Sequence, residues 1–230
     1  LVESISGGMT SLPDHPEFLE QRINDSLRSF DHRVSRPGSE SYLFVLEDLK
    51  TGKLVGSSGL IARVGGFDPF YTYRMVNEVL EYEPLEIHRS IQRLELIKNH
   101  KGPSEICSLF LHPDYRKHGL GKLLSLTRFC FIKAFPDRFA EHIIAEIRGY
   151  LDISGKSPFW EAVGKNFFWR DYYTADVLSG IGEKDFIQAL MPEHPIYVAL
   201  LPKSAREVIS KPHRQSEAAL AILLPSACTR

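Results

Sequence analysis

The sequence predicts a mixed α/β fold in which a mostly antiparallel sheet is flanked by helices. Three observations support this prediction: an early helical pattern, a series of short apolar runs that includes a hairpin, and a later alternation of strand and helix patterns. The chain has 230 residues, of which 43% are hydrophobic and 25% are charged. This balance is typical of a globular protein with a sizeable core.

The first part of the chain predicts a helix followed by a hairpin. Pro13 opens a helical pattern with apolar residues along one face, and Ser11 is the candidate N-cap. Residues Tyr42–Glu47 then form a candidate buried strand. A turn at 50–53 leads into a second strand over 54–64, so the two strands are expected to pair as a hairpin.

The remaining expected elements are short. Candidate strands are rich in apolar or aromatic residues, and candidate helices carry apolar residues at helical spacing. The strands are Phe70–Val79, Ile91–Ile97, Glu105–Leu111, His142–Ile147 and Pro195–Leu201. The helices are Gly119–Phe135, Pro158–Val163, Lys184–Leu190 and a helix start at Ala205–Ile209.

Charge and cysteine content argue against several function classes. A formal net charge of −1 provides no basic field for nucleic acid or for an anionic membrane. Cys107, Cys130 and Cys228 are too few and too scattered for a disulfide framework or a zinc site, and the first two lie in apolar runs that predict core residues. No apolar stretch has the length of a membrane span, and no signal-peptide pattern opens the sequence. We therefore expect a cytoplasmic protein that uses no metal.

The segment that carries chemistry follows the Glu105–Leu111 strand. It reads Arg116-Lys117-His118-Gly119-Leu120-Gly121-Lys122, an R-x-x-G-x-G pattern between an apolar strand and an amphipathic helix. Backbone N–H groups at a helix N-terminus attract anions, and glycines allow a diphosphate to approach them. The three basic side chains of this segment add positive charge beside the same amides. The alternative is that the two glycines only shape a tight turn. The pattern is neither a Walker loop, whose Gly-Lys-Ser/Thr ending it lacks, nor a dinucleotide fingerprint, whose third glycine would fall at Leu124.

This strand-loop-helix segment resembles the coenzyme A-binding motif of the GNAT acyltransferases. Several longer stretches resemble the bacterial arginine N-succinyltransferases, in order and over nearly the whole chain. These stretches are Phe44–Asp48, Pro69–Arg74, Ser104–Leu111, Ala145–Gly149, Ser157–Trp160 and Ala189–Tyr197. The resemblance implies a GNAT-like acyltransferase fold.

The same resemblance implies an enzyme of arginine catabolism. Such an enzyme transfers the succinyl group of succinyl-CoA to the α-amine of L-arginine, giving N2-succinylarginine and coenzyme A. The expected partners are these small molecules, not nucleic acid or a membrane, and the chain is expected to form a homo-oligomer or to pair with a related subunit.

The resemblance further implies a single acyl-CoA N-acyltransferase-like domain over residues 1–230. The family has a strand before its first helix, and Leu1–Ile5 reads as the end of that helix, stopped by Gly7 and Gly8. The family also continues beyond the last residue of this chain. We therefore expect the family's first strand and its C-terminal portion to be missing.

The residues expected to act in catalysis also come from the resemblance. Leu109 matches the position that the family associates with succinyl-CoA, with Phe110 and Leu111 after it, although Leu109 also reads as a core residue. His213 matches the proton donor to the departing thiolate, and the ordinary pKa of histidine, about 6.5, suits that role. Without the resemblance His213 reads as a surface histidine. Glu105 lies where many GNAT enzymes keep a carboxylate that takes up the amine proton, and a solvated strand-end glutamate is the alternative.

The expected substrate-binding residues lie on two predicted strands. Glu146 and Arg148 flank one apolar residue and so share a strand face, where they would bind the guanidinium and a carboxylate of the substrates or form a structural ion pair. Tyr73 and Arg74 offer a hydroxyl and a cation to the succinyl carboxylate, although an aromatic-rich strand is also typical of a core.

Two other functions remain open at this point. The chain could be a GNAT-like acyltransferase that uses another acyl-CoA and another amine, because one sequence does not rank pocket residues. It could also be a truncated, non-catalytic subunit that binds coenzyme A.

Overall fold

The structure of the 230-residue chain is a computed structural model that describes residues 15–31, 33–66, 68–180 and 185–227. The chain divides into two compact units. The first unit comprises residues 1–68, 100–147 and 215–230, and the second comprises residues 69–99 and 148–214. The helix end expected at Leu1–Ile5 and the expected helix start at Ser11 and Pro13 lie outside the described residues.

The first unit contains a four-stranded sheet with the order β1-β2-β5-β6. Its strands are β1 (Ser41–Asp48), β2 (Lys53–Ile61), β5 (Ser104–Leu111) and β6 (Ile143–Ile144). The pairs β1–β2 and β2–β5 are antiparallel, which confirms the predicted hairpin, while β5 and β6 are parallel. The prediction of a strand over His142–Ile147 was wrong beyond Ile144, because the chain leaves β5 at that point.

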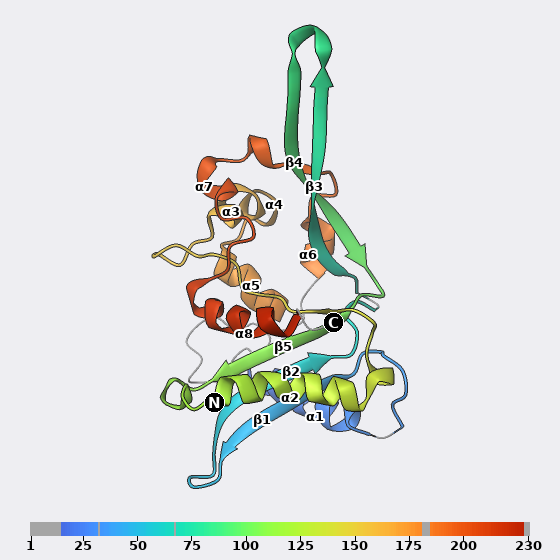
Figure 1. Ribbon diagram of the computed structural model, residues 1–230, viewed down its shortest axis with the longest axis vertical. Helices are drawn as coiled ribbons and strands as arrows, with labels where there is room; N and C mark the ends of the chain where they lie inside the picture. The colour runs from blue at the N-terminus through green and yellow to red at the C-terminus, as the bar shows by residue number, and fades with distance from the viewer. Residues whose placement is uncertain (1–14, 32, 67, 181–184, 228–230) are drawn as a thin grey trace. The chain divides into compact units, whose positions relative to one another are not determined.

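Three helices belong to the first unit: α1 (Pro16–Ser29), α2 (Leu120–Ala134) and α8 (Glu217–Ala227). α1 begins with Pro16 at its first helical position, and the His15 ring nitrogen accepts a hydrogen bond from the Phe18 N–H at 3.3 Å. His15 is therefore its N-cap. α2 confirms the helix expected over Gly119–Phe135, whereas α8 was not predicted (Figure 1).

An aromatic core holds the first unit together. Tyr42 of β1 is fully buried, and its ring centroid lies 4.9 Å from that of Phe131 on α2 and 5.2 Å from that of Phe30. Leu60 of β2 is fully buried in the same cluster. The prediction of a core position for Cys130 was wrong, because the helical period turns Phe131 toward this cluster and leaves Cys130 exposed.

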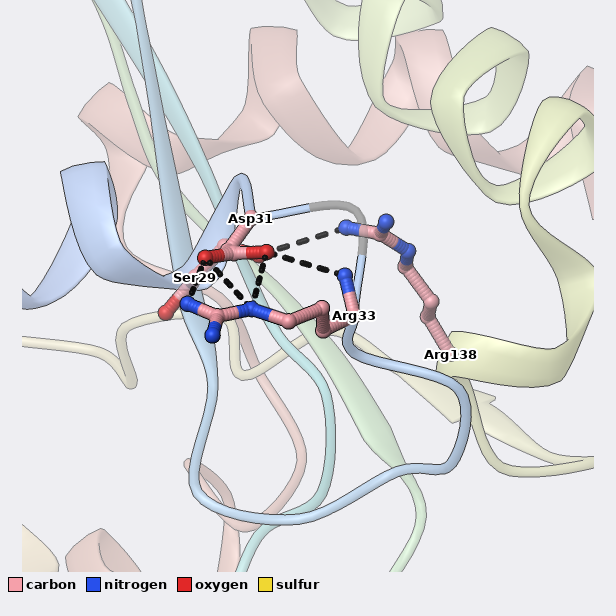
Figure 2. Close-up of polar contacts among 4 residues, drawn as sticks. All are labelled: Ser29, Asp31, Arg33 and Arg138. Atoms are coloured by element: carbon pink, nitrogen blue, oxygen red, sulfur yellow. Dashed lines mark hydrogen bonds and ion pairs between the residues drawn. The ribbon is translucent and has the colours of Figure 1, made fainter.

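A buried arginine fixes the end of α1. Arg138 lies in the 3₁₀ turn η4 (Pro136–Arg138), is 6% exposed, and donates from Nη1 to the Ser29 carbonyl at 3.2 Å. Figure 2 shows its guanidinium pointing toward the Asp31 carboxylate, which Arg33 binds at 2.6 Å. Arg138 thus satisfies one of the carbonyls that a helix C-terminus leaves without an intrahelical partner.

The second unit is built on a long hairpin. β3 (Phe70–Tyr82) and β4 (Ile87–Asn99) pair over their whole length, are joined by the turn η2 (Glu83–Leu85), and form the long two-stranded arm in Figure 1. β7 (Ile196–Tyr197) pairs with β4 near its middle. The two predicted strands of this hairpin are confirmed and are longer than expected.

Short helices complete the second unit: α3 (Pro158–Ala162), α4 (Gly164–Phe168), α5 (Tyr172–Gly180), α6 (Asp185–Leu190) and α7 (Lys203–Arg206). α4 and α5 were not predicted. The strand expected over Pro195–Leu201 was wrong beyond Tyr197, where the turn η5 (Val198–Leu200) follows. Trp160 stacks on Phe168 at 5.2 Å, and a Cβ on Gly164 would lie 2.4 Å from the Trp160 ring, so this packing requires glycine at 164.

Neither a metal cluster nor a membrane span occurs in the described residues. No group of three or more His, Cys, Asp or Glu in that part of the chain is placed to hold a metal ion. No helix there combines the length and the apolar character needed to cross a membrane.

Candidate functional site

The R-x-x-G-x-G segment lies between β5 and α2, as the sequence predicted. After β5 the chain forms the turn η3 (Pro113–Tyr115) and then passes through His118 and Gly119, whose φ angles of 54° and 75° are both left-handed. Gly119 is the N-cap of α2, and as a glycine it has no side chain to accept hydrogen bonds from the first-turn N–H groups. A Cβ on Gly119 would meet nothing within 4 Å. The first turn of α2 therefore opens beside free space.

The amides of this first turn can bind an anion. Helix N-terminal N–H groups lack intrahelical acceptors, and the helix dipole favours negative charge there. Lys117, His118 and Lys122 are exposed around the same turn. A Cβ on Gly121 would lie 3.8 Å from Leu111 and 3.9 Å from Ile222, so this glycine adjoins packed side chains.

Two side-chain hydrogen bonds hold the loop in place, one of them from Tyr115, which the sequence did not single out. The Tyr115 hydroxyl donates to Asp48 at 2.9 Å, which ties η3 to the β1–β2 turn and raises the pKa of Tyr115. Arg116 donates from Nε to the Leu111 carbonyl at 2.9 Å. Arg116 therefore braces the loop in addition to carrying the charge expected of it. No sequence pattern links Tyr115 to Asp48, because the two lie 67 positions apart.

β5 separates from its parallel neighbour within the first unit. β5 and β6 pair only at Ser104–Ile143 and Glu105–Ile144. Beyond Glu105, no strand among the described residues pairs with this edge of β5. The edge continues through Leu109, Phe110 and Leu111. A splayed strand of this kind offers backbone N–H and C=O groups to an extended ligand.

Glu105 lies where this separation begins. Its side chain is buried, with 9% of the residue exposed, so it is not the solvated strand-end glutamate of the alternative interpretation. The nearby Cys107 thiol has a raised pKa, chiefly because of burial and secondly because of the Glu105 charge. The thiol is therefore neutral at ordinary pH beside an acidic side chain.

The prediction that Glu146 and Arg148 share one strand face was wrong. No strand runs through 145–148, and Arg148 instead forms an ion pair with Asp176 of α5, with 3.1 Å between Nη2 and Oδ2. The two residues also belong to different units, Glu146 to the first and Arg148 to the second. Alternation along a strand does not apply where the chain has left the sheet.

The second unit brings Arg148 and His213 together. The His213 N–H donates to the Arg148 carbonyl at 2.7 Å, and Gly149 pairs with Pro212 as an isolated bridge. Burial lowers the pKa of His213, and the positive charge of Arg148 lowers it further. The backbone at His213 is therefore held by pairing with the Arg148–Gly149 segment, and the Arg148 charge acts on the His213 ring.

Two residues that the sequence did not reveal, Tyr172 and Asp176, lie beside Arg148. The Arg148 guanidinium lies 5.7 Å from the centroid of the Tyr172 ring, within cation–π range. Burial raises the pKa of Tyr172, and it raises the pKa of Asp176, which Arg148 lowers only in part. Both residues lie on α5, a helix without a sequence signal strong enough to predict it.

Tyr73 and Arg74 lie on β3 of the second unit. Burial raises the pKa of Tyr73 to about 12, so its phenol stays protonated at neutral pH. The Arg74 guanidinium donates to Glu95 of β4 at 2.9 Å, and 64% of its side chain is exposed. Arg74 is thus engaged across the hairpin while it remains open to solvent.

Comparisons with known proteins converge on one family. A family model described as "Arginine N-succinyltransferase beta subunit" matches residues 1–226. The chain is 46% identical over 216 residues to an arginine N-succinyltransferase of Yersinia pestis (strain Pestoides F), covering 94% of this chain and 61% of the relative. It is 43% identical to an arginine N-succinyltransferase of Salmonella schwarzengrund, covering 97% of this chain and 64% of that protein.

A solved structure is similar as well. The arginine/ornithine succinyltransferase subunit AI from Pseudomonas aeruginosa superposes with a TM-score of 0.84 at 39% identity, covering 94% of this chain and 62% of that one. The chain therefore spans about six-tenths of the length of the relatives it matches. The similarity to a succinyltransferase fold agrees with the expected mixed, mostly antiparallel architecture.

Proposed function

The chain belongs to the arginine N-succinyltransferase beta subunit family, and we propose on that basis that it transfers the succinyl group of succinyl-CoA to the α-amine of L-arginine. The products are N2-succinylarginine and coenzyme A. The observation that carries the proposal is the open first turn of α2 beside the splayed edge of β5, a combination that suits a diphosphate followed by an extended arm.

The first unit supplies the proposed coenzyme A site. The α2 amides and the cations Lys117 and Lys122 bind the diphosphate, and the backbone of Leu109–Leu111 contacts the pantetheine arm. Positioning of the thioester and stabilisation of its oxyanion dominate the rate, because coenzyme A is a good leaving group.

In the proposed reaction the α-amine attacks the thioester carbonyl, a C–N bond forms, and the C–S bond breaks. Glu105 takes up the amine proton, directly or through water, and His213 gives a proton to the departing thiolate. Arg148 and Arg74 bind carboxylates of the substrates, and Tyr73 adds a protonated hydroxyl. Glu146 contacts the arginine guanidinium. The reaction uses no metal.

We propose that the chain acts in the cytoplasm in arginine catabolism, where both substrates are metabolites. The family description "beta subunit" and the neighbour's "subunit AI" support association with another copy or with a related subunit.

The test is release of free thiol when the protein is mixed with one acyl-CoA and one amine. We expect release with succinyl-CoA and arginine, and slower release with acetyl-CoA. Ornithine is the second amine to test, because the similar Pseudomonas protein is named an arginine/ornithine succinyltransferase subunit. Release with acetyl-CoA alone moves the assignment to another acyl-CoA. Binding of coenzyme A without release from any pair identifies a non-catalytic subunit.

A further inference from the structure

β5 contains a bulge at Ser108 and Leu109. Ser57 of β2 faces Phe110 and Gly59 faces Cys107, so the single residue Ser58 stands opposite both Ser108 and Leu109. Ser108 has a φ of 52°, a left-handed conformation that costs a non-glycine residue about 1 kcal/mol or more. Such a conformation persists only where the surroundings hold it.

One of the groups that hold the bulge is a buried cation. Arg128 of α2 is 2% exposed and donates from Nη1 to the Cys107 carbonyl at 3.3 Å. Its Nε and Nη2 bind the carbonyl and the hydroxyl of Ser125 at 3.1 Å and 2.7 Å. Burial lowers the pKa of Arg128 to about 10, so the guanidinium keeps its charge at neutral pH.

A second group reaches the next carbonyl of the bulge. The buried Ser57 hydroxyl donates to the Ser108 carbonyl at 3.0 Å. Gly59 leaves room for this geometry, because a Cβ there would lie 3.1 Å from the Cys107 sulfur and 3.2 Å from the Ser108 side chain. Two successive carbonyls of β5 are therefore each fixed by a side chain from a different neighbouring element.

No ion pair joins Arg128 to a carboxylate within the described part of the chain. Burying a cation without a carboxylate partner costs free energy. Three hydrogen bonds to neutral acceptors offset part of that cost. α2 also carries the first-turn amides eight residues earlier, about 12 Å along the helix axis. One rigid helix thus joins the proposed diphosphate site to the bulge.

We infer that Arg128 and Ser57 are positioning residues of the proposed coenzyme A site, which fix the bulge carbonyls and so set the edge of β5 for the pantetheine arm. The inference rests on the proposed function. Neither residue needs to touch the ligand, since each acts through the backbone of Cys107 or Ser108.

The experiment compares two ligands by isothermal titration calorimetry. Coenzyme A spans the α2 turn and the β5 edge, whereas 3′-phosphoadenosine 5′-diphosphate lacks the pantetheine arm. We expect Arg128→Met and Ser57→Ala to weaken coenzyme A binding about tenfold, the scale of one lost charge-assisted or buried hydrogen bond. Binding of the nucleotide should stay within about twofold of the wild-type value. Arg128→Lys, which keeps the charge but loses the fork of donors, should recover part of the coenzyme A affinity.

Matched controls separate positioning from general damage. Ser58→Ala removes a buried hydroxyl that has no hydrogen-bond partner among the described residues, so the ratio of the two affinities should not change. Arg138→Met removes another buried arginine of the same unit, one that donates to the Ser29 carbonyl, and should lower stability without changing that ratio.

The two affinities of each variant test the positioning role. Equal losses of both ligands, or full coenzyme A affinity in both Arg128→Met and Ser57→Ala, overturn the positioning role. If Arg128→Met does not fold, Ser57→Ala and Arg128→Lys decide the question alone. If the wild-type chain binds neither ligand, the proposed coenzyme A site itself is wrong. If the wild-type chain binds both ligands and the variants bind them equally well, only the positioning role is wrong.

Discussion

Asp176 of α5 lies 3.1 Å from Arg148, and the two side chains are only 20% and 16% exposed. Burial raises the pKa of Asp176 by more than the guanidinium lowers it. The attraction within the pair therefore does not fully offset the cost of taking the carboxylate out of water. The Arg148 Nε is also buried without a hydrogen-bond partner among the described residues. We therefore expect the pair to add little net stability.

The first prediction concerns stability. Asp176→Ala should lower the free energy of unfolding by about 2 kcal/mol, because it leaves a buried guanidinium unpaired; partial exposure keeps the loss below that of a fully buried pair. The double variant Arg148→Met with Asp176→Leu should recover most of that loss in urea unfolding and should lose thiol-release activity. A double variant that is no more stable than Asp176→Ala would show that the pair is retained for stability.

The second prediction concerns the His213 ring. A folded-state pKa below the ordinary 6.5 means that the neutral ring is favoured, so the stability contribution of His213 is present above that pH and is lost as pH falls. If protonated His213 is the proton donor, kcat should fall as pH rises through this lowered pKa. Arg148→Met removes one of the two causes, and the His213 pKa should rise.

NMR titration of the imidazole protons measures this pKa without depending on turnover. Lys211→Met, which removes an exposed cation two residues from His213, is the matched control and should leave the titration nearly unchanged. His213→Ala should lower turnover while coenzyme A affinity stays nearly constant. An unchanged turnover in that variant would remove His213 from the mechanism.

The third prediction separates the two glycines of the motif. Gly119→Ala should cost about 1 kcal/mol in urea unfolding, because φ is 75°, and should weaken coenzyme A binding by placing a methyl group in open space beside the first-turn amides. Gly121→Ala should be neutral or slightly stabilising in unfolding, because its methyl group would make ordinary contacts and alanine favours the helix. Equal destabilisation by both changes would contradict the left-handed cap.

The fourth prediction concerns the succinyl carboxylate. Arg74→Ala should weaken succinyl-CoA binding about tenfold, the scale of one charge-assisted hydrogen bond, and should leave coenzyme A binding unchanged. Arg89→Ala, on the exposed part of the same hairpin, is the matched control and should change neither affinity. Identical binding of succinyl-CoA by Arg74→Ala and the wild type would limit Arg74 to its contact with Glu95.

Much of the fold was predictable where the signal was local. The β1–β2 hairpin, the strand β5 and the helix α2 each carry an apolar period of their own, and the structure places them within a few residues of the expected bounds. α4 and α5 were missed because their aromatic residues resemble a core cluster rather than a helix face. β6 was predicted too long, since its apolar run continues after the chain has left the sheet.

The candidate site also has a part that was predictable from local sequence and a part that was not. The glycine turn between β5 and α2 follows from the order of glycines, basic residues and an apolar helix within one short segment, so the sequence alone determined its place. The partners Asp176 for Arg148, 28 positions apart, and Cys107 for Arg128, 21 positions apart, have no local pattern. Only the tertiary structure decided them, because a buried cation binds whichever acceptors the path of the chain brings within reach, and that path depends on packing across the whole unit.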